Sequence, residues 1–142
     1  MVKIHQFTPS IVEGDGVSNG VIYTQKILKS LGFISNIYAG DIGKSLRDRV
    51  LSYKKIDKGD SSQILLIHYS IYYDFSSWID KLKCKKFMVY HNITPYHFFK
   101  KGTLTYKLCK EGVEYLPELS TKVDGAIGVS PLNSQELEQH GF

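Results

Sequence analysis

The chain has 142 residues, of which 42% are hydrophobic and 23% are charged, with a formal net charge of +4. This length corresponds to one ordinary domain, and the average globular composition excludes intrinsic disorder, collagen and coiled coil. The longest continuous apolar run, Ile64 to Ile67, is far shorter than the roughly 18 to 20 residues that cross a bilayer. We therefore do not expect a transmembrane protein.

The beginning of the chain, residues 1–9, lacks the apolar segment and small-residue cleavage site of a secretory signal, which predicts a cytoplasmic location. Cys84 and Cys109 are not in a C-x-x-C spacing, so reduced thiols are expected rather than a disulfide or a zinc site. The positive charge is mild and is not concentrated on one element, so no nucleic-acid partner is expected.

Two groups of lysines stand close together in the sequence. They are Lys54, Lys55 and Lys58, and Lys81, Lys83, Lys85 and Lys86. A solvated surface is the default interpretation of both groups. Attraction to phosphate or to anionic lipid is the alternative, and it would allow peripheral contact with a membrane.

Hydrophobic periodicity predicts an alternation of strands and helices. In chain order the expected elements are a strand at 2–7, a helix at 17–31, a strand at 33–39, a short helix at 44–52, a strand at 63–69, a short helix at 74–82, a strand at 86–91, a helix at 103–116, a strand at 123–129 and a helix at 131–139. Pro9 is expected to end the first strand and Pro117 to limit the fourth helix. Gly32 predicts a helix end, and Ser130-Pro131 predicts a helix start.

This order of elements indicates the α/β class, with a Rossmann-like parallel sheet and helices on both faces, because parallel neighbours need crossover connections. The nearly continuous apolar run at 63–69 is typical of a central strand. Ligands of such sheets bind beyond the carboxyl ends of the strands. The informative positions are therefore 8–20, 69–73, 91–95 and 130–133.

The glycine-rich loop that contains Gly14, Asp15 and Gly16 lies between the first strand and the first helix. Backbone N–H groups and the helix dipole can hold a phosphate at such a place, although a simple tight turn is an equally open interpretation. The loop is not a dinucleotide fingerprint, because the third glycine, Gly20, comes one position late. It is not a Walker loop either, because no Gly-Lys-Ser/Thr follows.

His91 directly follows a predicted strand, where an imidazole can address a ligand or merely brace the loop. His5 and His68 lie within predicted strands and are interpreted as core histidines. No cluster has the spacing of metal ligands and no local sequence suggests a covalent nucleophile, so neither a metal nor another bound cofactor is expected.

Four segments in register resemble the N-terminal half of family 4 glycosyltransferases, which have the GT-B architecture. They are Ile4 to Pro9, Gly14 to Asn19, Tyr90 to Pro95, and Gly128 to Phe142. The resemblance implies a retaining transfer of a sugar from a nucleotide-diphosphate-sugar donor to a sugar or lipid-linked acceptor. It further implies no obligatory metal, and a cleft between two Rossmann-like domains.

The same resemblance implies roles for individual residues. Gly14, Asp15 and Gly16 would approach the donor phosphates, and His91 would face the donor sugar as the catalytic residue. Asn92, Ser130 and Asn133 would line the cleft. The family's donor-binding domain would follow residue 142, so we expect residues 1–142 to be a single acceptor-binding domain that is inactive alone.

A second hypothesis needs no catalysis. The chain would then be a doubly wound binding module that recognises a phosphorylated ligand or a membrane surface through its lysines. The fold alone does not separate these two hypotheses, because one fold carries many functions.

Overall fold

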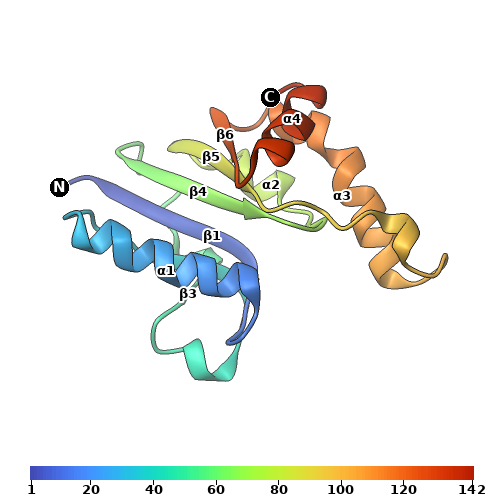
Figure 1. Ribbon diagram of the computed structural model, residues 1–142. Coiled ribbons are helices and arrows are strands. Elements are labelled where there is room, and N and C mark those ends of the chain that lie inside the picture. Colours follow the sequence, from blue (N-terminus) through green and yellow to red (C-terminus); the bar gives the residue numbers. More distant parts are fainter.

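The computed structural model describes residues 1–142 and contains one six-stranded sheet (Figure 1). Its strands are β1 (Lys3–Ile11), β2 (Ile37–Ile42), β3 (Leu51–Ser52), β4 (Gln63–Tyr69), β5 (Lys85–Tyr90) and β6 (Gly125–Gly128). The strand order is β3-β2-β1-β4-β5-β6, and every neighbouring pair is parallel. This arrangement confirms the predicted α/β, Rossmann-like fold.

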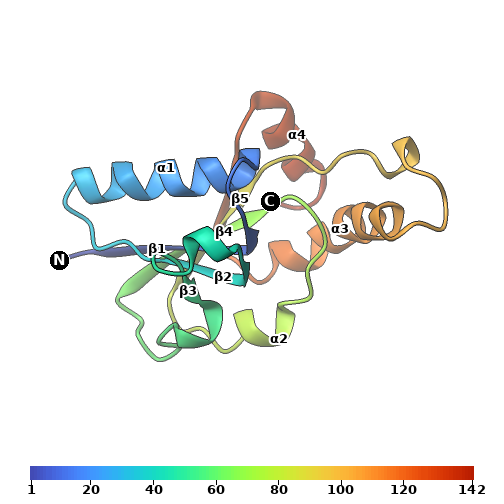
Figure 2. The same cartoon turned by 90° about the horizontal axis from the view of Figure 1, so that it is seen from below.

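The helices are α1 (Gly16–Ser30), α2 (Ser76–Ile79), α3 (Leu104–Ser120) and α4 (Pro131–Gln139), with short 3-10 turns η1 (Lys44–Leu46), η2 (Tyr53–Lys55) and η3 (Tyr96–Phe98). Helix α1 lies on one face of the sheet and α2 on the other (Figure 2). Helices α3 and α4 share the face of α2, because Trp78, Leu116 and Leu137 belong to one hydrophobic cluster. None of the helices combines the length and the hydropathy of a membrane span.

The two faces of the sheet bury separate hydrophobic clusters. Val21 of α1 packs in the smaller cluster with Ile37 and Ala39 of β2, whereas Tyr38 between them belongs to the larger cluster beneath α2, α3 and α4. This division follows from the alternation of side chains along a strand. Helix α1 packs on β1 and β2, and on the same side Ile127 of β6 remains 51% exposed.

Several predicted boundaries are confirmed. Strand β4 has the predicted bounds, and Gly32 takes a left-handed backbone with φ +91° directly after α1. Ser130 caps α4, because its Oγ accepts the Asn133 N–H at 3.2 Å. Cys84 and Cys109 are both free, as expected for reduced thiols.

The expectation that Pro9 ends the first strand is wrong, because β1 continues to Ile11. The Gln6 N–H donates toward β2, at 3.0 Å to Asn36 O, so by alternation the nitrogen of Pro9 faces the β4 side. Strand β4 pairs with β1 only as far as Phe7. The N–H that Pro9 lacks would therefore have had no acceptor on a neighbouring strand, so the proline does not interrupt the sheet.

The predicted helix at 44–52 is also wrong. The segment forms the turn η1 and then the two-residue strand β3. The second strand begins at Ile37 instead of residue 33, because side chains from elsewhere bind the backbone before it. Gln25 donates to Ser35 O at 2.9 Å, and His5 Nδ1 accepts the Asn36 N–H at 3.0 Å.

Helix α3 extends to Ser120 and contains Pro117, which was expected to limit it. A proline inside a helix costs about 3 kcal/mol or more. Leu116 and Leu119 on either side of Pro117 are fully buried, and each such side chain contributes about 1.5–3 kcal/mol when buried. Packing against the core therefore carries the helix past the proline.

Candidate functional site at the switch point of the sheet

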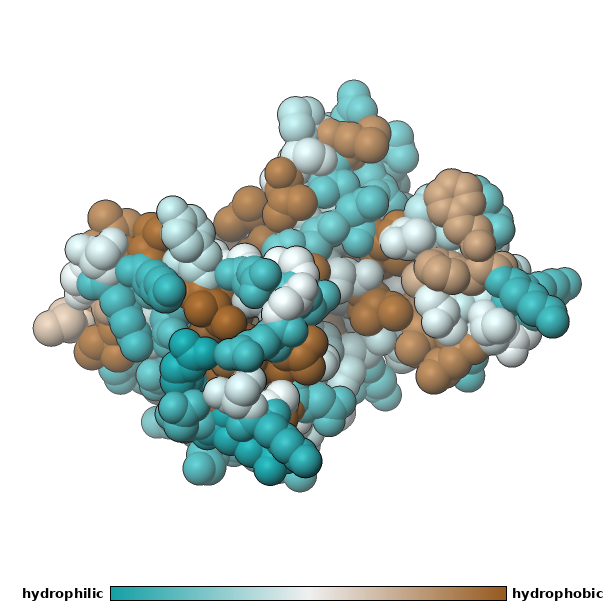
Figure 3. Space-filling view, turned by 60° about the horizontal axis from the view of Figure 1, so that its bottom comes forward, coloured by the Kyte–Doolittle hydropathy of each residue, from teal (hydrophilic) through white to brown (hydrophobic).

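The strand order reverses direction between β1 and β4. The chain leaves β1 toward β2 on one side and leaves β4 toward β5 on the other, so the two connections diverge and open a crevice at the carboxyl edge. A cavity of about 250 Å³ lies there. Its lining residues are Thr8, Pro9, Ser10, Val12, Asp15, Val17, Ser70 and Ile71. Figure 3 shows one face of the molecule, with an indented outline between the body of the domain and a lobe that projects to the right.

Asp15 begins α1 and organises the loop beside this cavity. One of its carboxylate oxygens accepts the Ser18 N–H at 3.0 Å and the Ser18 hydroxyl at 2.9 Å. The Ser18 hydroxyl in turn accepts the Val12 N–H at 3.1 Å, which ties the end of β1 to the helix. Asp15 is therefore a helix cap, and its carboxylate lines the cavity.

The neighbouring glycines serve the geometry of this turn. Gly14 has φ +83°, a conformation that other residues rarely adopt, and Gly16 is the first residue of α1. The N–H groups of Gly16 and Val17 have no hydrogen-bond acceptor within the chain. Two unpaired donors and the positive end of the α1 dipole therefore stand beside a carboxylate at the loop.

His91 lies directly after β5, with its backbone N–H bonded to Tyr69 O at 3.0 Å. Its Nε2 is 2.7 Å from Nδ1 of His68, the two rings stack at a centroid distance of 5.0 Å, and Nε2 of His68 is 2.9 Å from Oε1 of Gln6. Gln6 completes the chain by donating from Nε2 to Val21 O at 3.0 Å. A hydrogen-bonded polar chain thus runs along one face of the sheet, from the Val21 carbonyl of α1 to His91 at the carboxyl edge.

Burial governs the charge of both histidines. It lowers the pKa of His68 to about 3, with a smaller contribution from the charge of His91. Burial also lowers the pKa of His91, and the Asp15 carboxylate opposes this shift. Both imidazoles are therefore neutral at neutral pH, and Asp15 is close enough to His91 to influence it.

The other predicted site residues, Asn92, Ser130 and Asn133, lie in the loop after His91 and at the start of α4. Asn92 has an exposed side chain and a left-handed backbone, φ +71°, that turns the loop after His91. The Ser130 hydroxyl is engaged in the α4 cap, and Asn133 is 5% exposed within that helix. Of the predicted site residues, only Asp15 lines the cavity at the switch point, and its carboxylate is near enough to influence the pKa of His91. The residues that do not line this cavity are Gly14, Gly16, His91, Asn92, Ser130 and Asn133.

Gln6 and His68 are residues that sequence reasoning missed. Both are polar residues inside apolar strands, and both are buried. A polar residue inside an apolar strand was the only signal in the sequence. In the structure, Gln6 pairs with Leu66, two residues before His68, and His68 pairs with Val89, two residues before His91. All three side chains therefore lie on one face of the sheet, in adjacent strands.

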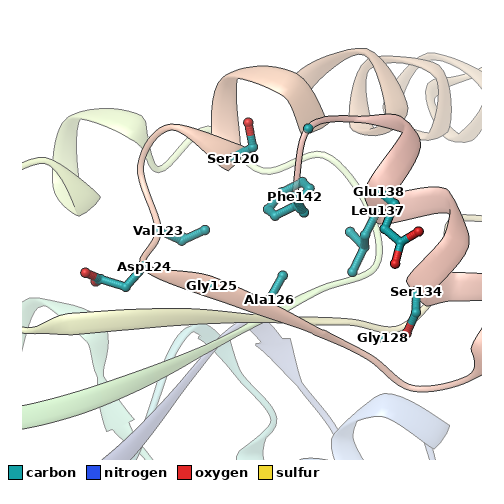
Figure 4. A pocket seen from close by; sticks show the side chains of 11 residues that line it. Ser120, Val123, Asp124, Gly125, Ala126, Gly128, Ser134, Leu137, Glu138 and Phe142 are labelled. Atoms are coloured by element: carbon teal, nitrogen blue, oxygen red, sulfur yellow. The ribbon is translucent and has the colours of Figure 1, made fainter.

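A larger cavity of about 450 Å³ lies between β6, α4 and the end of α3 (Figure 4). It is lined mainly by small and apolar residues. The carboxylate of Asp124 at its rim already accepts the Lys86 N–H at 2.8 Å and the Lys85 ammonium at 3.1 Å. Ser120, Ser134 and Glu138 also line this cavity, so it is the strand order, and not a more polar lining, that favours the switch point.

The two lysine groups meet in space. Lys54 and Lys58 line a cavity of about 400 Å³ with Lys81, together with Tyr53, Ser77 and Trp78. None of these three lysines forms an ion pair in the chain, whereas Lys85 pairs with Asp124. One lysine-lined cavity thus takes members from both groups.

No three His, Cys, Asp or Glu side chains gather closely enough to hold a metal ion. The sequence matches no protein-family model, and neither the curated proteins nor the solved structures contain a match to it.

Proposed function

We propose that this chain is the acceptor-side domain of a retaining sugar transferase that uses a nucleotide-diphosphate-sugar donor. The observation that carries the proposal is the cavity at the β1–β4 switch point, because sheets of this order bind ligands there. The motifs that resemble family 4 glycosyltransferases surround the same edge. Asp15 of those motifs lines the cavity, and His91 directly follows β5 on the same edge of the sheet, where the Asp15 carboxylate influences its pKa.

The chemistry of this edge suits a sugar and its diphosphate. The unpaired N–H groups of Gly16 and Val17 favour an oxyanion at the start of α1. The imidazole of His91 is a group that hydrogen-bonds sugar hydroxyls. Because bond breaking would need further groups that stabilise the leaving diphosphate, we propose that a donor-binding domain supplies them and that this chain alone turns over no donor.

The experiment is a titration of the ¹⁵N-labelled chain with UDP-glucose and GDP-mannose, followed by backbone amide shifts. We expect the amides of residues 14–17, 70 and 91 to move, with those near Ser134 beside the β6 cavity as the internal control. Saturating shifts confined to the β6 cavity would contradict the proposal. An absence of shifts with both donors would contradict a direct donor contact by residues 14–17 and 91, and would leave the acceptor-side role to be tested with an acceptor sugar. A peripheral membrane role for the same domain remains part of the second candidate.

The second candidate function is a non-enzymatic module for a phosphorylated ligand or an anionic membrane surface. Its supporting observation is the cavity lined by Lys54, Lys58 and Lys81, where three ammonium groups stand without a carboxylate among the lining residues. Like charges brought together without partners favour an external anion.

A further inference from the structure

The polar chain from Gln6 to His91 is expensive to bury. Gln6 is fully buried and His68 is 3% exposed, and a buried polar group without a partner costs about 1–3 kcal/mol. Each of the four side-chain atoms involved in Gln6 and His68 has a partner at 2.7–3.0 Å. Leucine side chains would fill the same space without needing hydrogen-bond partners. The buried hydrogen bonds of Gln6 and His68 therefore call for a functional explanation.

The donor and acceptor of each hydrogen bond in this polar chain follow from the bond between Gln6 and the Val21 carbonyl. Val21 O is a carbonyl and can only accept, so the Gln6 amide nitrogen points to it and Oε1 points to His68. His68 must then donate from Nε2, and as a neutral imidazole it accepts at Nδ1. His91 must therefore donate from Nε2 to His68.

The other ring nitrogen of His91 faces outward. Its Nδ1 has no hydrogen-bond partner in the chain, and it is not among the buried unpartnered atoms, which belong to Ser35, Trp78 and Tyr115. Nδ1 is therefore accessible to solvent. In a neutral ring whose Nε2 carries the hydrogen, Nδ1 has a free lone pair.

We propose that Gln6 and His68 are positioning residues that fix His91 as the Nε2–H tautomer, so that its Nδ1 accepts a hydrogen bond from a ligand hydroxyl at the carboxyl edge of the sheet. The ligand group at this point is a donor, and an anionic phosphate or carboxylate is disfavoured there. The inference rests on the proposed function only in taking this hydroxyl to be a sugar's.

Two titratable groups face His91, and both bear on this state. His68 holds its Nε2, and the Asp15 carboxylate lies on the cleft side. Protonation of His91 would turn Nδ1 into a donor, and Asp15 would then compete with the ligand for it. The acceptor role therefore belongs to pH values at which His91 is neutral.

The test is the tautomer of each histidine in the free chain, read from two-bond ¹⁵N–¹H correlations of the imidazole rings at neutral pH. We expect His68 and His91 both to be neutral and both to carry the hydrogen on Nε2. His97 and His140, which lie outside the polar chain, give reference signals in the same spectra. A His91 ring with its hydrogen on Nδ1, or a charged ring at neutral pH, would overturn the proposal.

Two variants separate positioning from simple structural support. His68→Asn retains a carbonyl oxygen where Nδ1 stood, so His91 should keep the Nε2–H tautomer. His68→Leu removes the acceptor, so the His91 signals should change to the averaged pattern of both tautomers. If His91 keeps one tautomer in both variants, Gln6 and His68 do not position it. Because this readout uses no ligand, it can fail while donor binding at the cleft succeeds, and the reverse is equally possible.

Discussion

Nδ1 of His68 lies 2.7 Å from Nε2 of His91, and the two residues come from the neighbouring strand ends of β4 and β5. His68 is buried and His91 is half-exposed, so this contact links the interior of the sheet to its carboxyl edge.

Replacing His91 by alanine should weaken binding of UDP-glucose at least tenfold, which is about 1.4 kcal/mol, if His91 contacts the ligand. The melting temperature should change little, because water can reach the nitrogen of His68 that the substitution leaves. Calorimetric titration and thermal melts measure the two effects, with the exposed His97→Ala as the control. Unchanged affinity with a lower melting temperature would mean that His91 only braces the loop.

Gln6→Leu should lower the free energy of unfolding by about 2–3 kcal/mol, because a nearly isosteric side chain removes two buried hydrogen bonds and leaves the His68 N–H without an acceptor. Gln25→Leu is the matched control. It also removes one amide bond, to Ser35 O at 2.9 Å, but at a less buried site, so it should cost about 1 kcal/mol. Urea unfolding measures the free energy of unfolding of both variants. Equal decreases would contradict the expected cost of leaving the buried His68 N–H without an acceptor.

Acid should destabilise the fold through His68. Its pKa falls from the ordinary 6.5 to about 3 in the folded chain, so between these values the unfolded chain binds the proton and the folded chain does not. The stabilising contribution is complete above about pH 6.5 and is lost as the pH falls toward 3, by up to about 1.4 kcal/mol per pH unit. Urea unfolding at pH 7 and pH 5 should show the loss, and His68→Asn should reduce it. Parallel pH profiles of the two proteins would contradict this assignment.

Asp15 can be tested for its cap and its charge separately. Asp15→Ala should destabilise the chain by about 1 kcal/mol, since α1 loses its cap, whereas Asp15→Asn keeps an oxygen that can accept from Ser18 and should be nearly neutral. Asp15→Asn should also lower the pKa of His91 further, because the carboxylate now opposes that shift. If the loop holds donor phosphates, Asp15→Asn should bind UDP more tightly than the parent chain. NMR titration of His91 and calorimetry with UDP check both expectations.

The lysine-lined cavity predicts binding to anionic vesicles. The chain should sediment with phosphatidylcholine vesicles that contain phosphatidylserine, less so at higher salt, and not with pure phosphatidylcholine. Combined substitution of Lys54, Lys58 and Lys81 by glutamine should remove this binding, while Lys26→Gln and Lys29→Gln on α1 should not. If all variants bind equally, or the parent chain does not bind, the three lysines form a solvated surface.

Local sequence determined those elements whose signals are local. The continuous apolar run at 63–69 gave β4 its bounds, Ser130-Pro131 set the start of α4, and Gly32 ended α1. The alternation of strands and helices was enough to predict the parallel α/β sheet, because crossover connections impose it. Local signals failed at 33–36, where the distant side chains of His5 and Gln25 bind the backbone, and at 44–52, where part of the segment pairs with β2 as strand β3.

The position of His91 after a strand was visible in the sequence, but its partner was not. His68 was interpreted as a core histidine, which its burial supports, yet its ring is bonded to His91 and to Gln6. These contacts depend on the strand order and on the pairing of His68 with Val89, which place residues 62 and 23 positions apart within hydrogen-bond distance. Sequence fixes which groups can donate and accept, whereas the register between strands decides which of them meet, because it is set by packing across the whole sheet.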